Sequence, residues 1–161
     1  MTESGGRSTI AIVGGGPGGY VAAIRAAQLG AKVALVEKDK VGGTCLNWGC
    51  IPTKALIVSA EMLEMARHAG EFGVEVGQVS VNFPAVMERK NKVVNQMVGG
   101  VSTLLKAHKV DVFKATASLR EPGVLQLQGE GVPAEVRAEN IIIATGSDSA
   151  RPPIPGLDLP G

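Results

Sequence analysis

A glycine-rich turn between a short apolar run and a helix-like segment limits the folds open to this chain more than any other feature. The run Ile10–Val13 is apolar and rich in β-branched residues, as in a buried parallel strand. The turn covers residues 14–19, and the Ala-rich segment 20–29 that follows it stops at a glycine, as helices often do. A second apolar strand, residues 32–36, ends on Glu37. This order predicts two parallel strands joined by a right-handed helical crossover.

The glycines of the turn have the spacing of a dinucleotide-binding site. Gly14 permits the tight turn after the strand, Gly16 lets a pyrophosphate approach the backbone, and Gly19 lets helix and strand pack closely. The helix N-terminus adds free N–H groups for the phosphates, and Glu37 is placed to accept hydrogen bonds from a ribose. A lone glycine turn has a purely structural interpretation, but the ordered set of strand, turn, helix, strand and acid favours a nucleotide. The motif does not decide between NAD and FAD.

Composition excludes several other classes of protein. The chain has 161 residues, 45% of them hydrophobic, which suits one domain with a core and argues against intrinsic disorder. Its 16 basic and 15 acidic residues provide no concentrated positive face for nucleic acid or an anionic membrane. No apolar run is long enough for a transmembrane helix, and the polar start lacks the apolar stretch of a signal peptide. We therefore expect a cytoplasmic protein.

The remaining pattern predicts a disordered N-terminus over residues 1–8, one domain over residues 9–150 and a Pro-rich linker over residues 151–161. Within the domain we expect a loop over residues 38–50 that runs into a helix ending near residue 69. A second helix is expected over residues 83–108, in which Gly99-Gly100 marks a bend or close packing. The expected strands are residues 110–119, 124–128 and 134–137 in a small antiparallel meander, and residues 141–144 as a buried strand.

Two cysteines, Cys45 and Cys50, lie close together before the second helix. The only histidines, His68 and His108, do not form a metal-like cluster with them, so we expect no metal site. A structural disulfide is disfavoured in a reducing compartment, which leaves a redox-active pair or two inert thiols. Cys50 stands just before Pro52, at a predicted helix N-terminus where the helix dipole favours a thiolate. The upstream nucleotide site shifts the balance toward redox chemistry, because a flavin would exchange electrons with such a pair.

The cysteines belong to a longer motif, Gly-Gly-Thr-Cys-Leu-Asn-Trp-Gly-Cys-Ile-Pro-Thr-Lys-Ala-Leu over residues 42–56. This motif resembles the redox-active disulfide segment of the class I pyridine nucleotide–disulfide oxidoreductases. Residues 14–30 resemble the FAD-binding opening of the same family, and residues 144–147 resemble its strand-end motif near the flavin. Three positions favour the lipoamide branch of the family over the glutathione and mercuric reductases: Pro17, Leu46 and Ile51.

The resemblance implies an α/β fold, namely a Rossmann-like FAD-binding domain with a parallel sheet, helices and a small antiparallel β-meander, incomplete at its C-terminal end. It also implies that FAD contacts the glycine turn, the ribose-binding acid, the cysteine segment and two later strands. The implied cofactor-binding residues are Gly14, Gly16, Gly19, Glu37, Lys38, Gly43, Thr44, Cys45, Lys54, Ala117, Thr145 and Gly146.

Three residues of the cysteine segment are implied to be catalytic. Cys50 would be the thiol beside the flavin ring, and Cys45 would be the interchange thiol that reacts with the sulfur of the substrate. Lys54 would lie under the reactive edge of the flavin, where a basic residue stabilises the reduced ring. Outside this motif, a Lys one turn into an amphipathic helix is more often a solvated charge. Electrons would pass from dihydrolipoamide through the Cys45–Cys50 pair to FAD and then to NAD.

Enzymes of this family are longer, so the resemblance implies that this chain is the N-terminal, FAD-binding portion of a homodimeric enzyme whose NAD site lies in a later domain. The implied partner is the lipoyl domain of a 2-oxoacid dehydrogenase or glycine cleavage complex. We expect this portion alone to hold FAD weakly and to lack lipoamide turnover. Two alternatives stay open: a stand-alone flavin-binding or thiol redox-sensing module, and a related reductase that acts on another disulfide or on a metal ion.

Overall fold

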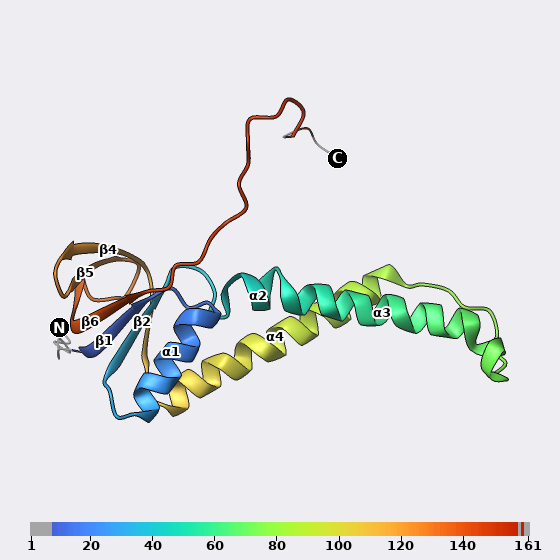
Figure 1. Ribbon diagram of the computed structural model, residues 1–161, viewed down its shortest axis with the longest axis horizontal. Coiled ribbons are helices and arrows are strands. Elements are labelled where there is room, and N and C mark those ends of the chain that lie inside the picture. Colours follow the sequence, from blue (N-terminus) through green and yellow to red (C-terminus); the bar gives the residue numbers. More distant parts are fainter. Residues whose placement is uncertain (1–7, 158, 160–161) are drawn as a thin grey trace.

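The computed structural model describes residues 8–157 and residue 159, and its centre is a six-stranded sheet in the order β3-β2-β1-β6-β5-β4 (Figure 1). Parallel pairing joins the first four strands: β3 (Asp111–Lys114), β2 (Val33–Glu37), β1 (Ser8–Val13) and β6 (Glu135–Ile143). Antiparallel pairing from the first part of β6 adds two more: β5 (Val124–Gln128) and β4 (Thr116–Glu121). This arrangement confirms the predicted α/β class, with a parallel sheet and an antiparallel meander.

Strands β1 and β2 are buried on both faces, which explains why their sequences are continuous apolar runs. Successive side chains alternate between two cores, because neighbouring residues of a strand point to opposite faces. On one face, Ala11, Ala34 and Val36 pack against apolar residues of the meander. On the other face, Ile12 and Leu35 pack against helices. The parallel sheet is therefore the middle of three layers.

Helix α1 (Pro17–Gln28) begins inside the glycine turn and packs on the helix side of β1 and β2. Pro17 occupies the first helical turn, so the helix starts three residues earlier than the predicted residue 20. Gly30 follows the helix with a φ of +91°, a conformation that glycine allows where a helix ends. The parallel register of Ile10 with Val33 confirms the predicted strand, helix and strand unit.

A helical hairpin follows β2. The segment 38–50, predicted as a loop, contains a short helix, α2 (Gly43–Asn47), which is too short to show an apolar period. Helix α3 (Cys50–His68) begins at the second cysteine, and a 3₁₀ turn, η1 (Ala69–Phe72), ends it. Helix α4 (Phe83–Ala107) then returns along α3, so that the two helices run side by side and α3 projects beyond the sheet (Figure 1).

The glycine pair in α4 neither interrupts the helix nor marks a close contact. The helix runs unbroken through Gly99 and Gly100. A Cβ at either position would meet no atom within 4 Å, and both residues are exposed. The prediction of close packing at this pair is therefore wrong, because the pair lies on the exposed side of the helix.

The meander departs from the predicted strands at two places. The strand predicted over residues 110–119 is divided at the buried Ala115, where the chain leaves β2 and begins to pair with β5. The strands predicted over residues 134–137 and 141–144 are one strand, β6, which pairs first with β5 and then with β1. Apolar patterning reports burial and not the identity of the pairing strand, so the sequence showed neither feature.

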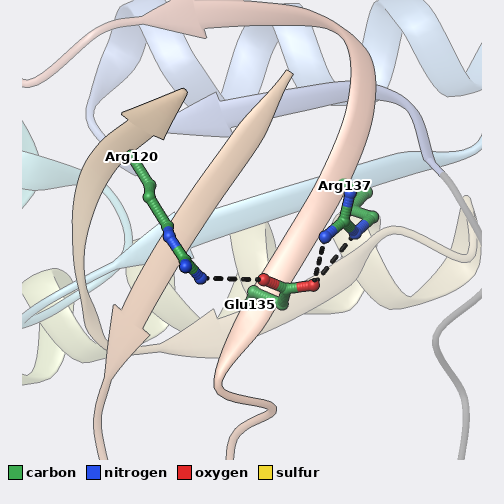
Figure 2. A network of polar contacts seen from close by, with 3 residues as sticks. All are labelled: Arg120, Glu135 and Arg137. Carbon is green, nitrogen blue, oxygen red and sulfur yellow. Dashed lines mark hydrogen bonds and ion pairs between the residues drawn. The ribbon is translucent and has the colours of Figure 1, made fainter. Parts of the chain in front are cut away.

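The meander carries a small ion-pair network (Figure 2). Glu135 accepts a hydrogen bond from Arg137 at 2.9 Å and lies 3.7 Å from Arg120, which comes from β4. All three side chains are at least one-third exposed. Exposed pairs of this kind stabilise a fold by about 0.2–1 kcal/mol, so the network is a minor contribution.

The first strand begins at Ser8 and the last strand ends at Ile143. Ser8, predicted to belong to the disordered N-terminus, is instead the buried first residue of β1, and residues 1–7 lie outside the described residues. The predicted linker is described over residues 151–157 and residue 159, where it leaves the domain without helix or strand (Figure 1). Within the described residues, no helix combines the length and apolar content needed to cross a bilayer.

Candidate functional site

The predicted phosphate turn lies where the carboxyl ends of three parallel strands meet. The Gly14 N–H donates to the Val36 carbonyl at 2.8 Å and so joins the turn to the end of β2. The Ala144 N–H donates to the Val13 carbonyl at 2.8 Å and so brings the end of β6 to the same place. Ligands of open α/β sheets bind in the crevice outside the carboxyl ends of the strands.

The space around the turn explains why three of its positions are glycine. A Cβ at Gly14 would overlap the carbonyl of Ala144, and a Cβ at Gly19 would overlap the carbonyl of Gly14. A Cβ at Gly16 would meet only the Cα of Gly43, at 3.8 Å. Gly14 and Gly19 are therefore needed for the turn to pack, whereas Gly16 leaves the space beside the turn open.

The N-terminus of α1 faces this open space without a cap of its own. Gly16 is the N-cap residue, no side chain caps the helix, and the first turn holds no acidic residue. Free N–H groups and the helix dipole make such an end a site for anions. The turn and the helix start together therefore have the form of a pyrophosphate cradle.

Glu37 holds the turn and the following loop together. Its Oε2 accepts a hydrogen bond from the Gly15 N–H at 2.6 Å, and its Oε1 accepts one from the Asp39 N–H at 2.8 Å. This clamp was not predicted from the sequence. A carboxylate oxygen can accept more than one hydrogen bond, so each oxygen retains capacity for a ribose hydroxyl. Lys38, the next residue, is exposed.

The cysteine segment contacts the glycine turn directly, although no sequence spacing relates the two motifs. The Gly42 N–H donates to the Gly15 carbonyl at 2.8 Å. Gly43 approaches Gly16 so closely that a Cβ on Gly43 would stand 2.7 Å from the Gly16 Cα. Gly42 and Gly43 have left-handed φ angles of +99° and +57°, which glycine adopts without the steric cost that other residues pay. The two predicted motifs therefore form one site.

The two thiols lie next to each other where α2 ends and α3 begins. Cys45 is a partly buried residue of α2, and Cys50 is the exposed first residue of α3, as predicted for a helix N-terminus. A hydrogen bond with the Cys50 side chain is the largest cause that raises the pKa of Cys45, followed by burial and the charge of Cys50. The Cys50 N–H and the Lys54 ammonium lower the pKa of Cys45. On balance Cys45 retains its proton to a higher pH than an ordinary thiol, because these causes together raise its pKa.

Lys54, a predicted site residue, lies on the same helix as Cys50. It lies one turn into α3 and is exposed, as is Thr44 in α2. The charge of Lys54 lowers the pKa of Cys45, as the smallest of the causes that act on it. Within the described residues, no group of three His, Cys, Asp or Glu side chains is arranged to hold a metal ion.

Asn47 is a residue of this site that the sequence did not predict. Its Nδ2 donates to the Val41 carbonyl at 3.2 Å and to the Gly43 carbonyl at 3.0 Å. The residue stands between the two cysteines, but no spacing rule assigns a role to an amide there. Only the path of the folded chain brings both carbonyls within its reach.

The segment after β6 completes the edge that the glycine turn occupies. The Thr145 Cα lies so near Gly14 that a Cβ on Gly14 would stand 3.0 Å from it. Gly146 follows with a left-handed φ of +71°. The structure thus brings Thr145 and Gly146 to the edge where the turn, Glu37 and the cysteine segment meet.

Ala117 occupies a different place. It lies in β4 opposite Leu127 and packs against the core on the meander side of the sheet. The residue of this segment that reaches the end of β2 is Ala115, whose N–H donates to the Glu37 carbonyl at 3.0 Å. Ala115 was not among the predicted site residues, because the change of strand partner at that position does not show in the sequence.

Comparisons with known proteins identify the family to which the chain is similar. A family model described as pyridine nucleotide-disulphide oxidoreductase matches residues 8–161. The chain is 48% identical over 149 residues to a dihydrolipoyl dehydrogenase of Acholeplasma laidlawii and 45% identical over 152 residues to one of Bacillus subtilis. These alignments cover 92% and 93% of this chain but 43% and 33% of the relatives. The chain therefore spans less than half the length of these curated relatives.

A solved structure shares the fold. It is the Cu(II) complex of a mutant of the HOCl-induced flavoprotein disulfide reductase RclA from Escherichia coli, with a TM-score of 0.77 and 30% sequence identity. The match covers 93% of this chain and 31% of that chain. The family model covers the α/β sheet as well as the glycine and cysteine motifs. This chain therefore belongs to the pyridine nucleotide-disulphide oxidoreductase family.

Proposed function

We propose that this chain holds FAD against its glycine turn and carries a redox-active Cys45–Cys50 pair that exchanges electrons with a substrate disulfide. One observation carries the proposal. Cys45 in α2 and Cys50 at the start of α3 lie on a segment that is hydrogen-bonded to the glycine turn, through the Gly42 N–H and the Gly15 carbonyl at 2.8 Å, and Cys50 shifts the pKa of Cys45. A nucleotide in the turn and a disulfide in the segment would therefore be neighbours.

The residues present fit FAD. The open space at Gly16 and the uncapped start of α1 suit the pyrophosphate, and Glu37 retains acceptor capacity for the adenosine ribose. The remaining cofactor contacts are proposed on the strength of the resemblance and of their place along the same edge: Gly14, Gly19, Lys38, Gly43, Thr44, Cys45, Lys54, Thr145 and Gly146. Ala117, in the meander, is proposed as an adenine contact on the resemblance alone.

FAD, when bound, supplies a two-electron acceptor that NAD can reoxidise. The sulfur chemistry belongs to the chain itself. In the oxidised form, a substrate thiolate attacks the Cys45 sulfur, the Cys45–Cys50 bond breaks, and Cys50 leaves as a thiolate at the start of α3. A second substrate thiol then attacks the mixed disulfide, so that Cys45 leaves with the electron pair and the substrate leaves as a disulfide. Cys50 is suited to the role of leaving group because it lies at a helix N-terminus.

For the whole enzyme we propose dihydrolipoyl dehydrogenase activity, in which dihydrolipoamide is oxidised and NAD is the final acceptor at a site outside this chain. Identities of 45–49% to proteins of that name support this choice. The proposed partner is the lipoyl domain of a 2-oxoacid dehydrogenase or glycine cleavage complex, in a cytoplasmic homodimer. In an enzyme that contains this chain, Cys45→Ser is expected to abolish lipoamide-dependent NADH formation, and unchanged turnover would contradict the assignment.

The cofactor and the thiol pair can be tested on the chain alone. The purified chain is expected to bind FAD weakly, seen as a saturable change in flavin fluorescence during titration, and its two cysteines should be titratable after reduction but not after mild oxidation. Gly16→Val fills the space beside the turn and should remove flavin binding, whereas Gly99→Ala, in open space on α4, should not. Preferential binding of NAD, or equal flavin binding by Gly16→Val, would contradict the FAD site.

A related reductase is the second candidate, because the solved structure that shares the fold is called a flavoprotein disulfide reductase and is a Cu(II) complex. Its 30% identity is lower than the 48% identity to a dihydrolipoyl dehydrogenase. The two candidates are separated by turnover of the whole enzyme with dihydrolipoamide and NAD against turnover with Cu(II) and a reduced nicotinamide. Activity in the second assay alone would favour the reductase.

A further inference from the structure

Asn47 closes the loop that joins the phosphate turn to the thiols. It is the last residue of α2, and its Nδ2 donates to the carbonyls of Val41 and Gly43 at 3.2 and 3.0 Å. The Asn47 side chain is partly buried, so water competes less with these hydrogen bonds than it would at the surface. One amide group thus ties the end of α2 back to its own beginning.

Leu46 anchors α2 in the core on the helix side of the sheet, but the helix has few hydrogen bonds of its own, so the Asn47 tie matters for its shape. A helix of 5 residues is far below the length at which helices are stable alone. One of its few backbone hydrogen bonds, from the Leu46 N–H to the Gly42 carbonyl, is long at 3.4 Å. The segment also begins with Gly42, whose left-handed φ gives it no intrinsic preference for a helix. The Asn47 amide therefore adds two side-chain hydrogen bonds to this short helix, one to its first residue, Gly43, and one to Val41 just before it.

Helix α2 is also the element that presents Cys45 to Cys50. We propose that Asn47 is a positioning residue that favours the disulfide form of the Cys45–Cys50 pair, by holding Cys45 beside the first residue of α3. The inference rests on the proposed redox function of the pair. It assigns a role in the redox equilibrium to a residue whose side-chain hydrogen bonds go to backbone carbonyls.

The equilibrium can be measured with glutathione as the redox partner. The reaction is Cys45–SH plus Cys50–SH plus one glutathione disulfide, giving the Cys45–Cys50 disulfide plus two glutathione thiols. Its equilibrium constant rises with the effective concentration of one protein thiol at the other, which is what a fixed α2 provides. Loss of the tie should therefore lower the constant and make the pair easier to reduce.

The test uses Asn47→Asp in the full chain, because Asp is similar in size but replaces the two N–H donors with an acceptor that faces two carbonyl oxygens. We expect the equilibrium constant to fall about tenfold, which corresponds to a reduction potential about 30 mV less negative. Asn47→Ala, which removes the donors without adding charge, should give a smaller fall of about three- to fivefold. Asn95→Asp makes the same chemical change on the exposed face of α4 and should leave the constant unchanged.

The measurement is thiol trapping across a series of glutathione buffers with mass spectrometry of the cysteine peptide, and far-UV circular dichroism confirms that each variant is folded. If wild-type chain forms no Cys45–Cys50 disulfide in any buffer, the proposed redox function fails. If wild-type chain forms it and both Asn47 variants have the same equilibrium constant as wild type, the positioning role of Asn47 fails. If Asn95→Asp lowers the constant as much as Asn47→Asp does, the effect is one of net charge and the inference is likewise overturned.

Discussion

At the scale of single residues, steric space separates glycines that look alike in the sequence. A Cβ at Gly19 would overlap the carbonyl of Gly14, whereas a Cβ at Gly99 would meet nothing within 4 Å. Both residues lie in helices, so the difference is tertiary. Position 19 cannot accept a side chain, because the backbone of Gly19 touches the backbone of Gly14.

Alanine substitutions at these two glycines should therefore change the free energy of unfolding in opposite directions. Gly19→Ala forces helix and strand apart and should lower the free energy of unfolding by at least about 1–3 kcal/mol, the usual cost of overpacking. Gly99→Ala should raise it by about 0.5–1 kcal/mol, because alanine has the higher helix propensity and the space is open. Urea denaturation followed by circular dichroism measures both, and a stable Gly19→Ala variant would contradict the structure of the turn.

A second prediction at the residue scale concerns the pKa of Cys45, which two substitutions should shift in opposite directions. Cys50→Ala removes the hydrogen bond that is the largest cause of the raised pKa, so the pKa of Cys45 should fall and its thiolate should form at lower pH. Lys54→Met removes a positive charge that lowers the pKa, so the thiolate of Cys45 should need a higher pH.

The readout is the rate of iodoacetamide alkylation of Cys45 against pH, resolved by peptide mass spectrometry in the reduced chain. Relative to wild type, the profile should move to lower pH in Cys50→Ala and to higher pH in Lys54→Met. Shifts of the same sign in both variants would show that the thiols are not in contact as described.

At the scale of elements, α4 has an explicit start signal. The Oδ1 of Asn82 accepts a hydrogen bond from the Ala85 N–H at 3.1 Å and caps the helix. Asn82→Ala should cost about 1 kcal/mol of stability, within the usual range for a lost N-cap, and should fray the first turn of α4. Asn82→Asp retains the acceptor and should remain within about 0.5 kcal/mol of wild type. Urea denaturation gives the stabilities and amide hydrogen exchange near residue 85 gives the fraying; equal stabilities for the two variants would refute the cap.

The elements also show what the sequence could and could not predict. The β1–α1–β2 unit was predictable because its glycine spacing, apolar strands and terminal acid are all local signals. The division at Ala115 and the fusion of two predicted strands into β6 were not, because strand partners are set by tertiary contacts. The same holds for the site: the glycine and cysteine motifs were visible, but their contact and the role of Asn47 depend on left-handed glycines that bend the chain back.

At the scale of the whole molecule, two cores share the same pair of strands. Leu125, 2% exposed, belongs to the core on the meander side, and Leu105, 1% exposed, belongs to the core on the helix side. Each core contains side chains of β1 and β2, so neither layer can lose its packing without exposing one face of the central strands.

The domain should therefore unfold as one cooperative unit. Leu125→Ala and Leu105→Ala should each lower the free energy of unfolding by about 2–5 kcal/mol, the usual cost of truncating a buried leucine. Both variants should retain a single transition that coincides by circular dichroism and by Trp48 fluorescence. A curve with two steps in either variant would mean that the meander and the helical layer are separate cooperative units.

The parallel pairing of β1 with β6 also has a consequence for the order of events during synthesis. Ser8 lies opposite Ala138, so the first strand must wait for a partner made roughly 130 residues later. At about 5–20 residues per second, that delay is about 7–26 seconds. During this interval β1 has β2 on one side and an open edge on the other, and such edges pair readily with other chains. The nascent chain therefore carries an open apolar strand edge until β6 emerges and pairs with β1.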